Sequence, residues 1–258
     1  DTMEQADWLV FQVLSKRSSL MKSFINNRYK DRPVLINFMS DFINRFLNDP
    51  RPEIAASFDA LFGGDWYPEW QSLIGLGLSR EAAAIEVYTT RLKKAGNYAF
   101  VTSTRILKPG ADRSYFHLIY ATRHWKGIQE FRRVEKKAVK VQERIRNLKN
   151  YHAQIDRTGQ ESLFCDQLAD MPTSRFDEEK QLQINRGFEQ LLRALEANPE
   201  GIKFGQLLGE ILQTPLVWEN ELKTWIGTLK RQGKINIPAL KPRERVPRPE
   251  YLIMPTNL

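Results

Sequence analysis

The stretch VLINFMSDFINRFL, from Val34 to Leu47, passes from an apolar run to polar residues and then to aromatic residues at helical spacing. Its first part predicts a short buried strand, and Pro33 is acceptable at the start of one. Its second part predicts a helix from about Asp41 to Leu47. Open α/β sheets bind ligands at the carboxyl ends of their strands, so Asn37 and Asp41 are candidates for contacts to a ligand or cofactor. The alternative is that Asp41 caps the helix and Asn37 satisfies local backbone groups.

The composition is that of a globular protein with room for two domains. The chain has 258 residues, of which 41% are hydrophobic and 27% charged, and no apolar run approaches the ~18 residues of a membrane span. The first residue is not Met and no signal-peptide pattern follows it, so we expect a cytoplasmic protein whose natural chain begins upstream of Asp1. Cys165 is the only cysteine and the three histidines are scattered, which argues against a metal or iron–sulfur site within this chain.

The net charge of the chain is +8, with an isoelectric point near 9.5. Clustered Lys and Arg are favoured by phosphates, so a nucleic acid is a plausible partner. Charge alone does not establish that partner.

The N-terminal part predicts helices around a small sheet. We expect one or two helices over 3–27, two short helices flanking FGGDW, and a longer helix in SREAAAIEVYTTRLKKAG that Ser79 caps. The runs YAFVTSTRIL and SYFHLIYAT, joined by KPGADR, predict an antiparallel hairpin. The predicted architecture is therefore α/β.

A long helix is predicted from about Lys126 to Tyr151. Its apolar positions are spaced by three and four residues, which predicts an inward stripe: Phe131, Val134, Ala138, Val141, Ile145 and Leu148. Its other faces carry nine Lys or Arg and three Glu. They form either a solvated surface or one that faces phosphates.

The remaining sequence has the element order of a winged helix. Turn-rich sequence predicts a linker over 156–176, which separates an α/β domain, 1–155, from a C-terminal domain, 177–258. In that domain we expect a helix at 177–197, a short strand, and two further helices; the inward residues of the first helix are Leu182, Phe188, Leu191, Leu192 and Leu195. The last of these buries Trp218, Leu222, Trp225 and Leu229, and two strands then bracket the basic loop KPRERVPRPE.

Exposed cations of this domain are the predicted nucleic-acid-binding residues. They are Lys223, Lys230 and Arg231 on the third helix and Lys241, Arg243, Arg245 and Arg248 in the loop. Glu219 and Glu221 stand near the N-terminus of the third helix, where they suit the helix dipole and would repel phosphate. The alternative is a loop that docks a protein or serves only the fold.

Three segments resemble the three-Cys-motif partner protein family (TcmP): LINFMSDFINRFL, DALFGGDW and YFHLIYATRHWKG. The resemblance extends over about 18–258. Residues that match the two longer motifs are Asn37, Phe38, Asp41, Phe42, Asn44, Arg45, His124, Lys126 and Gly127, whereas Arg123 and Trp125 depart from the pattern.

The resemblance implies a doubly wound, methyltransferase-like (Rossmann-like) domain followed by a winged helix. It also implies a radical-SAM-like partner protein bearing three cysteines, and a phage-associated or mobile-element setting that includes antiviral defence. Family members carry an upstream glycine-containing cofactor half and an Asp-Pro-Phe-Gly segment. This chain has no glycine before Gly63, and its Asp49-Pro50 precedes Arg51. We therefore expect a partial sheet with no cofactor of its own; S-adenosylmethionine becomes possible if the missing half exists elsewhere.

Two functions follow as hypotheses. The first is a nucleic-acid-associated accessory protein without chemistry of its own, which binds nucleic acid or a partner through the winged helix. The second is the C-terminal portion of an S-adenosylmethionine-dependent nucleic-acid methyltransferase. Whether the chain is part of an enzyme stays open at this point.

Overall fold

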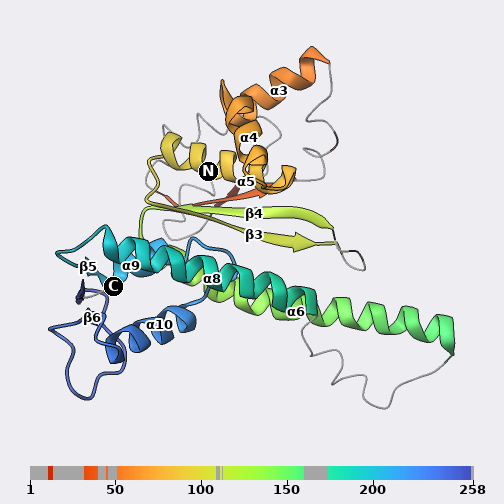
Figure 1. Ribbon diagram of the computed structural model, residues 1–258. Coiled ribbons are helices and arrows are strands. Elements are labelled where there is room, and N and C mark those ends of the chain that lie inside the picture. The colour runs from red at the N-terminus through yellow and green to blue at the C-terminus, as the bar shows by residue number, and fades with distance from the viewer. Residues whose placement is uncertain are drawn as a thin grey trace. The chain divides into compact units, whose positions relative to one another are not determined.

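The computed structural model describes residues 11–13, 32–39, 45, 51–108, 111, 113–159 and 174–256. The chain forms two compact units: Asp1–Ile106 with Arg113–His124, and Leu107–Asp112 with Trp125–Leu258. The described part is mixed α/β, with seven helices and two small sheets built largely of antiparallel pairs. Figure 1 labels the helices and several of the strands.

The first unit contains a four-stranded sheet in the order β1-β2-β4-β3. The strands are β1 (Phe11–Val13), β2 (Val34–Phe38), β3 (Phe100–Leu107) and β4 (Ser114–Thr122). β1 runs parallel to β2, and β2 runs antiparallel to β4, with Ile36 opposite Ile119. The segment between β3 and β4 is too short for the crossover that a parallel pair needs, so these neighbours form the predicted hairpin.

The expectation of helix over 3–27 is wrong at Phe11–Val13, which form a strand. A short apolar run fits a buried strand as well as a helix, and here pairing with β2 decides between them. The rest of 3–27 lies outside the described residues. So does the helix expected over 41–47, apart from Arg45, which is helical and exposed.

Three helices pack on this sheet: α3 (Pro52–Phe62), α4 (Trp66–Gly75) and α5 (Arg80–Ala95). Alternate residues of β2 enter one core with helix aromatics: Val34, Ile36, Phe38, Phe58, Phe62, Trp66, Trp70 and Tyr88. The rings of Phe62 and Trp66 stack with centroids 4.7 Å apart. The predicted cap of α5 is confirmed, because the backbone N–H of Ala82 donates to Ser79 Oγ at 3.2 Å.

The second unit begins with the long helix α6 (Trp125–Thr158) and continues with α8 (Ser174–Glu196), α9 (Phe204–Ile211) and α10 (Glu219–Arg231). Its strands are β5 (Ile202–Lys203), β6 (Ile235–Asn236) and β7 (Leu252–Pro255). They form a sheet in the order β5-β7-β6, and both pairs are antiparallel. Helix α6 thus groups with the C-terminal elements, whereas the sequence had placed it before a boundary at 156–176; residues 160–173 of that linker lie outside the described ones.

The predicted inward stripe of α6 is wrong at its four central positions, whereas Phe131 and Leu148 at its ends are half-buried. Val134, Val141 and Ile145 are 64%, 58% and 46% exposed, and Ala138 is exposed as well. The buried face lies to one side of that stripe and carries Ile128, Arg132, Glu135, Val139, Glu143 and Arg146. Four of these six are charged, and they pair as Arg132–Glu135 and Glu143–Arg146, so burial does not leave them without partners.

The Arg132–Glu135 pair anchors α6 to the C-terminal helices. Arg132 is fully buried, and it donates from Nε to the carbonyl oxygen of Leu212 at 2.8 Å and from Nη2 to that of Gln213 at 3.1 Å. Glu135 accepts from Arg132 with one oxygen and from Trp218 Nε1 with the other, at 3.2 Å. Every polar group of this cluster is therefore engaged inside the protein.

Two smaller expectations for the C-terminal helices also need correction. In α10 the buried positions are Leu222, Ile226 and Leu229, while Trp225 is only half-buried and packs edge-to-face on Phe188. In α8, Leu182 is half exposed rather than inward. Leu191 and Leu195 are buried as predicted.

Candidate nucleic-acid interface

The basic loop, residues 241–250, connects β6 to β7 and presents the four predicted cations to solvent: Lys241, Arg243, Arg245 and Arg248 are all exposed. Its end is held by backbone hydrogen bonds from the start of α9. Phe204 N donates to the carbonyl oxygen of Tyr251 and Gly205 N to that of Pro249, both at 2.8 Å. The loop therefore has a fixed attachment to the fold.

Glu244 organises the basic loop from within, and sequence reasoning missed it. Its carboxylate accepts from Lys241 N at 3.2 Å, Arg248 Nε at 3.1 Å and the Tyr251 hydroxyl at 3.1 Å. The hydrogen bond from the Lys241 backbone, with those from Tyr251 and Arg248, lowers the pKa of Glu244. No sequence signal pointed to this role, because a spacing of four residues predicts contact only within a helix.

Glu244 also divides the loop cations into two kinds. Arg248 forms an ion pair with Glu244, because its Nη2 lies 3.0 Å from the carboxylate. Arg243 and Arg245 are exposed and form no ion pair with any described residue. These two are the loop arginines most available to an external anion.

The predicted cations of α10 also fall into two groups, those exposed to solvent and one paired with a carboxylate of the same helix. Lys230 and Arg231 are exposed at its C-terminal end, just before β6. Lys223 is half-buried and forms an ion pair with Glu219 of the same helix, with Nζ 2.5 Å from the carboxylate. Its ammonium is therefore less available to an external phosphate than those of exposed lysines. Burial opposes ionisation of Glu219, but hydrogen bonds from Lys223 and Gln129 outweigh it and lower the pKa of that carboxyl.

The N-terminal end of α10 is acidic and internally engaged. Glu221 accepts from Trp218 N at 3.2 Å and pairs with Lys180 at 3.4 Å. The positive charge of the C-terminal elements is thus concentrated at the end of α10 and in the basic loop that follows β6. The start of α10, where a recognition helix reads bases, offers carboxylates instead.

Asn37, the other predicted site residue, lies near the end of β2. Its Oδ1 is buried and accepts no hydrogen bond from the described residues. Asp41 lies outside the described residues, so its expected contact with a ligand stays a prediction. A buried amide oxygen without a partner among the described residues is uncommon.

A polar cluster in the first unit was not predicted, because the sequence showed His117 only as one of three scattered histidines. Glu81, in the first turn of α5, lies 2.7 Å from His117 Nε2 in β4. Ser114 also hydrogen-bonds Glu81, and its Oγ accepts from Arg105 Nε at 2.7 Å. Burial would raise the pKa of Glu81, yet these hydrogen bonds and the charges of His117 and Arg105 lower it to about 2.

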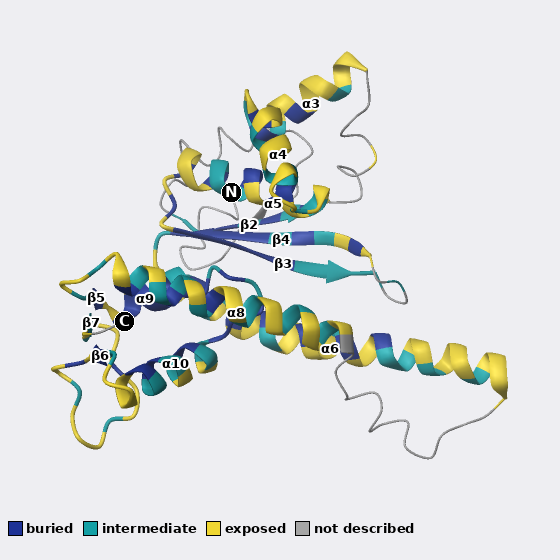
Figure 2. Ribbon diagram, viewed as in Figure 1, coloured by how far each residue is buried: buried dark blue, intermediate teal, exposed yellow. Residues whose placement is uncertain are grey.

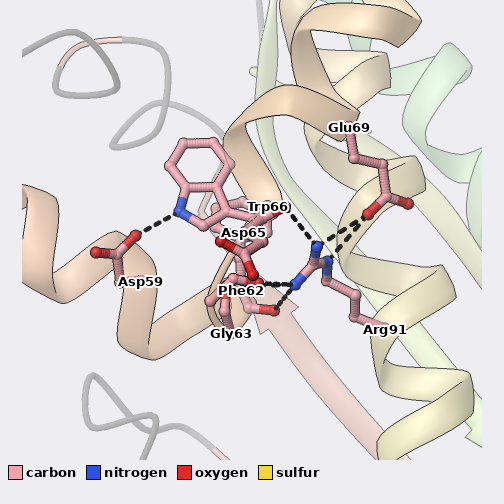
Figure 3. Close-up of polar contacts among 8 residues, drawn as sticks. Asp59, Phe62, Gly63, Asp65, Trp66, Glu69 and Arg91 are labelled. Carbon is pink, nitrogen blue, oxygen red and sulfur yellow. Dashed lines mark hydrogen bonds and ion pairs between the residues drawn. The ribbon is translucent and has the colours of Figure 1, made fainter.

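Arg91 holds the FGGDW segment, residues 62–66, in a turn through its hydrogen bonds, which gives the segment a structural role (Figure 3). Its guanidinium donates to four consecutive carbonyl oxygens, those of residues 62–65, at 2.6–3.4 Å. The same group pairs with Glu69, with Nε and Nη2 each 3.1 Å from Oε2. Gly63 and Asp65 have positive φ values of 86° and 57°, a turn that points these carbonyls at Arg91.

Comparisons with protein-family models, with curated proteins and with solved structures find no match for this chain. The resemblance to the three-Cys-motif partner proteins stays a prediction from its motifs. Within the described residues, no three His, Cys, Asp or Glu side chains are grouped as a metal site would need. A search of the same residues for a helix of the length and apolarity that a bilayer requires finds none.

Proposed function

We propose that this protein binds nucleic acid through its C-terminal unit and acts as an accessory protein of a larger system. The order α8, β5, α9, α10, β6, basic loop, β7, with the sheet order β5-β7-β6, supports a winged helix. The proposal includes two features implied by the resemblance, a three-Cys partner protein and a phage-associated setting. It also includes a cytoplasmic location, which rests on the composition.

The observation that carries the proposal is the basic loop with its two unpaired arginines. Arg243 and Arg245 stand on a loop whose shape Glu244 and the backbone bonds to α9 hold in place. A guanidinium on a pre-organised loop binds a phosphate with little ordering cost. The loop therefore suits contact with a nucleic-acid backbone.

The carboxylates at the start of α10 indicate what kind of binding to expect. Glu219 and Glu221 would oppose insertion of that end into a groove lined by phosphates. Binding should thus depend on backbone charge more than on base sequence, with a steep dependence on salt.

The test replaces the two unpaired arginines, as R243Q/R245Q, and measures the affinity for a short duplex DNA and the RNA of the same sequence against salt concentration. The slope of log K against log salt should fall by about two, because each lost phosphate contact removes about 0.9. The matched control, K94Q/R113Q, removes two exposed cations of the first unit and should leave the slope unchanged. Equal slopes for wild type and R243Q/R245Q would refute the proposal.

The sheet of the first unit favours a second candidate, the C-terminal portion of an S-adenosylmethionine-dependent nucleic-acid methyltransferase. The hairpin β3–β4 places its second strand antiparallel beside β2, which itself pairs in parallel with β1. This arrangement is consistent with the final strands of a doubly wound methyltransferase sheet. Asn37 near the end of β2, whose Oδ1 accepts no hydrogen bond from the described residues, supports a ligand at this edge of the sheet.

Calorimetric titration with S-adenosylmethionine separates the candidates. Micromolar binding that N37A weakens at least tenfold would favour the methyltransferase. No heat from this chain, together with salt-dependent nucleic-acid binding, would favour the accessory protein. L35A, which changes the preceding residue on the same face of the strand, controls for damage to β2.

A further inference from the structure

A row of exposed apolar side chains runs along α6: Val134, Ala138, Val141 and Ile145, which together are named the α6 stripe. The three larger members are each about half exposed or more. Their spacing of four, three and four residues puts them on one face of the helix, over a length of roughly 17 Å at 1.5 Å per residue. Figure 2 shows exposed segments along this helix.

The charges beside the α6 stripe are basic. Lys137 and Lys149 lie three or four residues from members of the stripe, both are exposed, and neither pairs with a carboxylate among the described residues. The acids of the same stretch are already engaged: Glu135 and Glu143 are buried against arginines of their own helix. Glu130, just before the stripe, pairs with Arg133 at 3.0 Å.

We propose that the α6 stripe docks an amphipathic helix of a partner protein whose apolar seam is flanked by acidic residues. Side chains spaced in this way fit between those of a facing helix, and flanking charges select the partner of opposite sign. The lysines gain carboxylate partners in such a complex, and the valines and isoleucine lose contact with water. This interaction is separate from the nucleic-acid contact of the basic loop.

Three other occupants fit the surface less well. A second copy of this chain would bring lysines against lysines across the seam, in either orientation. A membrane surface favours Trp, Phe and Leu on the apolar face, and the stripe has none of these. A nucleic acid would use the lysines but gives no reason for four apolar residues between them.

The experiment uses two synthetic helical peptides and the full chain. Both peptides carry Leu at their seam positions; the acidic one has Glu at the flanking positions, and the control peptide has Lys there. Like charges at these flanks also keep each peptide from pairing with itself. Binding is measured by the anisotropy of a fluorescent label on the peptide.

Two variants test the two parts of the surface. V141Q/I145Q removes apolar contact and keeps the charge, whereas K137Q/K149Q removes two flanking charges and keeps the apolar contact. Each should weaken binding of the acidic peptide by about tenfold or more, which corresponds to about 1.4 kcal/mol. L76Q changes an exposed leucine of the first unit and should have no effect; circular dichroism checks that each variant keeps its helices.

The outcomes separate the occupants. Binding of the acidic peptide but not the control peptide, lost in both α6 variants, supports the proposal. No binding of the acidic peptide by wild type, or equal binding by V141Q/I145Q, overturns it. A dimer that V141Q/I145Q dissociates in sedimentation would assign the stripe to a second copy, and DNA binding lost only in K137Q/K149Q would assign it to nucleic acid.

Discussion

Each unit contains one arginine that joins backbone carbonyl oxygens to a glutamate, and the two arginines lie in different surroundings. Arg91 in the first unit and Arg132 in the second each donate to backbone carbonyl oxygens and pair with one glutamate. The side chains of Arg91 and Glu69 are 25% and 41% exposed, whereas those of Arg132 and Glu135 are each 1% exposed. Water can replace a lost partner at the first site and not at the second.

This difference shows that the number of hydrogen bonds is a poor guide to the importance of an ion pair. A carboxylate near the surface gives up interactions with water when it pairs, so the net gain is small. A buried pair has already lost its hydration, and removal of one member leaves the other charged without a partner. The predictions below follow from this contrast.

The largest effect is expected for E135A. Arg132 would keep its two carbonyl acceptors but lose its counter-ion, and Trp218 Nε1 would lose its acceptor. We expect the free energy of unfolding to fall by about 3–5 kcal/mol. Urea unfolding monitored by Trp fluorescence provides the measurement.

The double variant R132M/E135L tests the cause of that loss. If the loss comes from an unpaired buried charge, removal of both charges should restore most of the stability. A double variant as unstable as E135A would instead point to the carbonyl contacts of Arg132.

A smaller effect, visible through pH, is expected at Glu81 in the first unit. Its folded pKa of about 2 lies below the ordinary value of 4.5. The ionised form therefore stabilises the protein fully above pH ~4.5, and this contribution is lost as pH falls towards 2. E81Q should lower the stability by at most about 3 kcal/mol at neutral pH and flatten the acid limb of the stability profile.

E86Q provides the control, because Glu86 is an exposed residue of the same helix. Stability profiles from neutral to acidic pH should coincide for wild type and E86Q. If E81Q keeps the full acid dependence of wild type, the network of Glu81, His117 and Ser114 is not its source.

R91A should cost less than E135A. It removes the donor to the four carbonyl oxygens of residues 62–65, and water can reach part of this site. We expect a loss of about 1–3 kcal/mol in the free energy of unfolding. The control is R193A, which breaks an exposed ion pair with Glu189 and should leave the free energy of unfolding almost unchanged. If R91A lowered that free energy as much as E135A does, the partly exposed and the buried arginine would not differ in importance.

The features that the sequence predicted are those set by local chemistry. Ser79 begins α5 because its hydroxyl satisfies a free backbone N–H, and the β3–β4 hairpin follows from two β-rich runs around a turn. Arg243 and Arg245 are exposed, as expected for charged residues in a short loop that contains several prolines. None of these depends on a distant partner.

The buried face of α6 and the strand at Phe11–Val13, which the sequence missed, depend on distant partners. Apolar spacing alone chose the wrong face of α6, because Arg132 and Glu135 can be buried only when Trp218 and the carbonyl of Leu212 complete their hydrogen bonds. These partners lie about eighty residues further along the chain. The same reason applies to Phe11–Val13, where pairing with β2 overrides a helical pattern.

The smallest effect is expected for E69Q, which completes the contrast with E135A. Glu69 is the more exposed member of its pair, and Arg91 keeps all four carbonyl acceptors when the carboxylate becomes an amide. We expect a loss of about 0.2–1 kcal/mol, and less at high salt, since exposed charges are screened. The loss in E135A should not depend on salt, because ions do not reach that pair. If salt reduced the loss of stability equally in E69Q and E135A, the burial of Arg132 would not explain the difference between the two arginines.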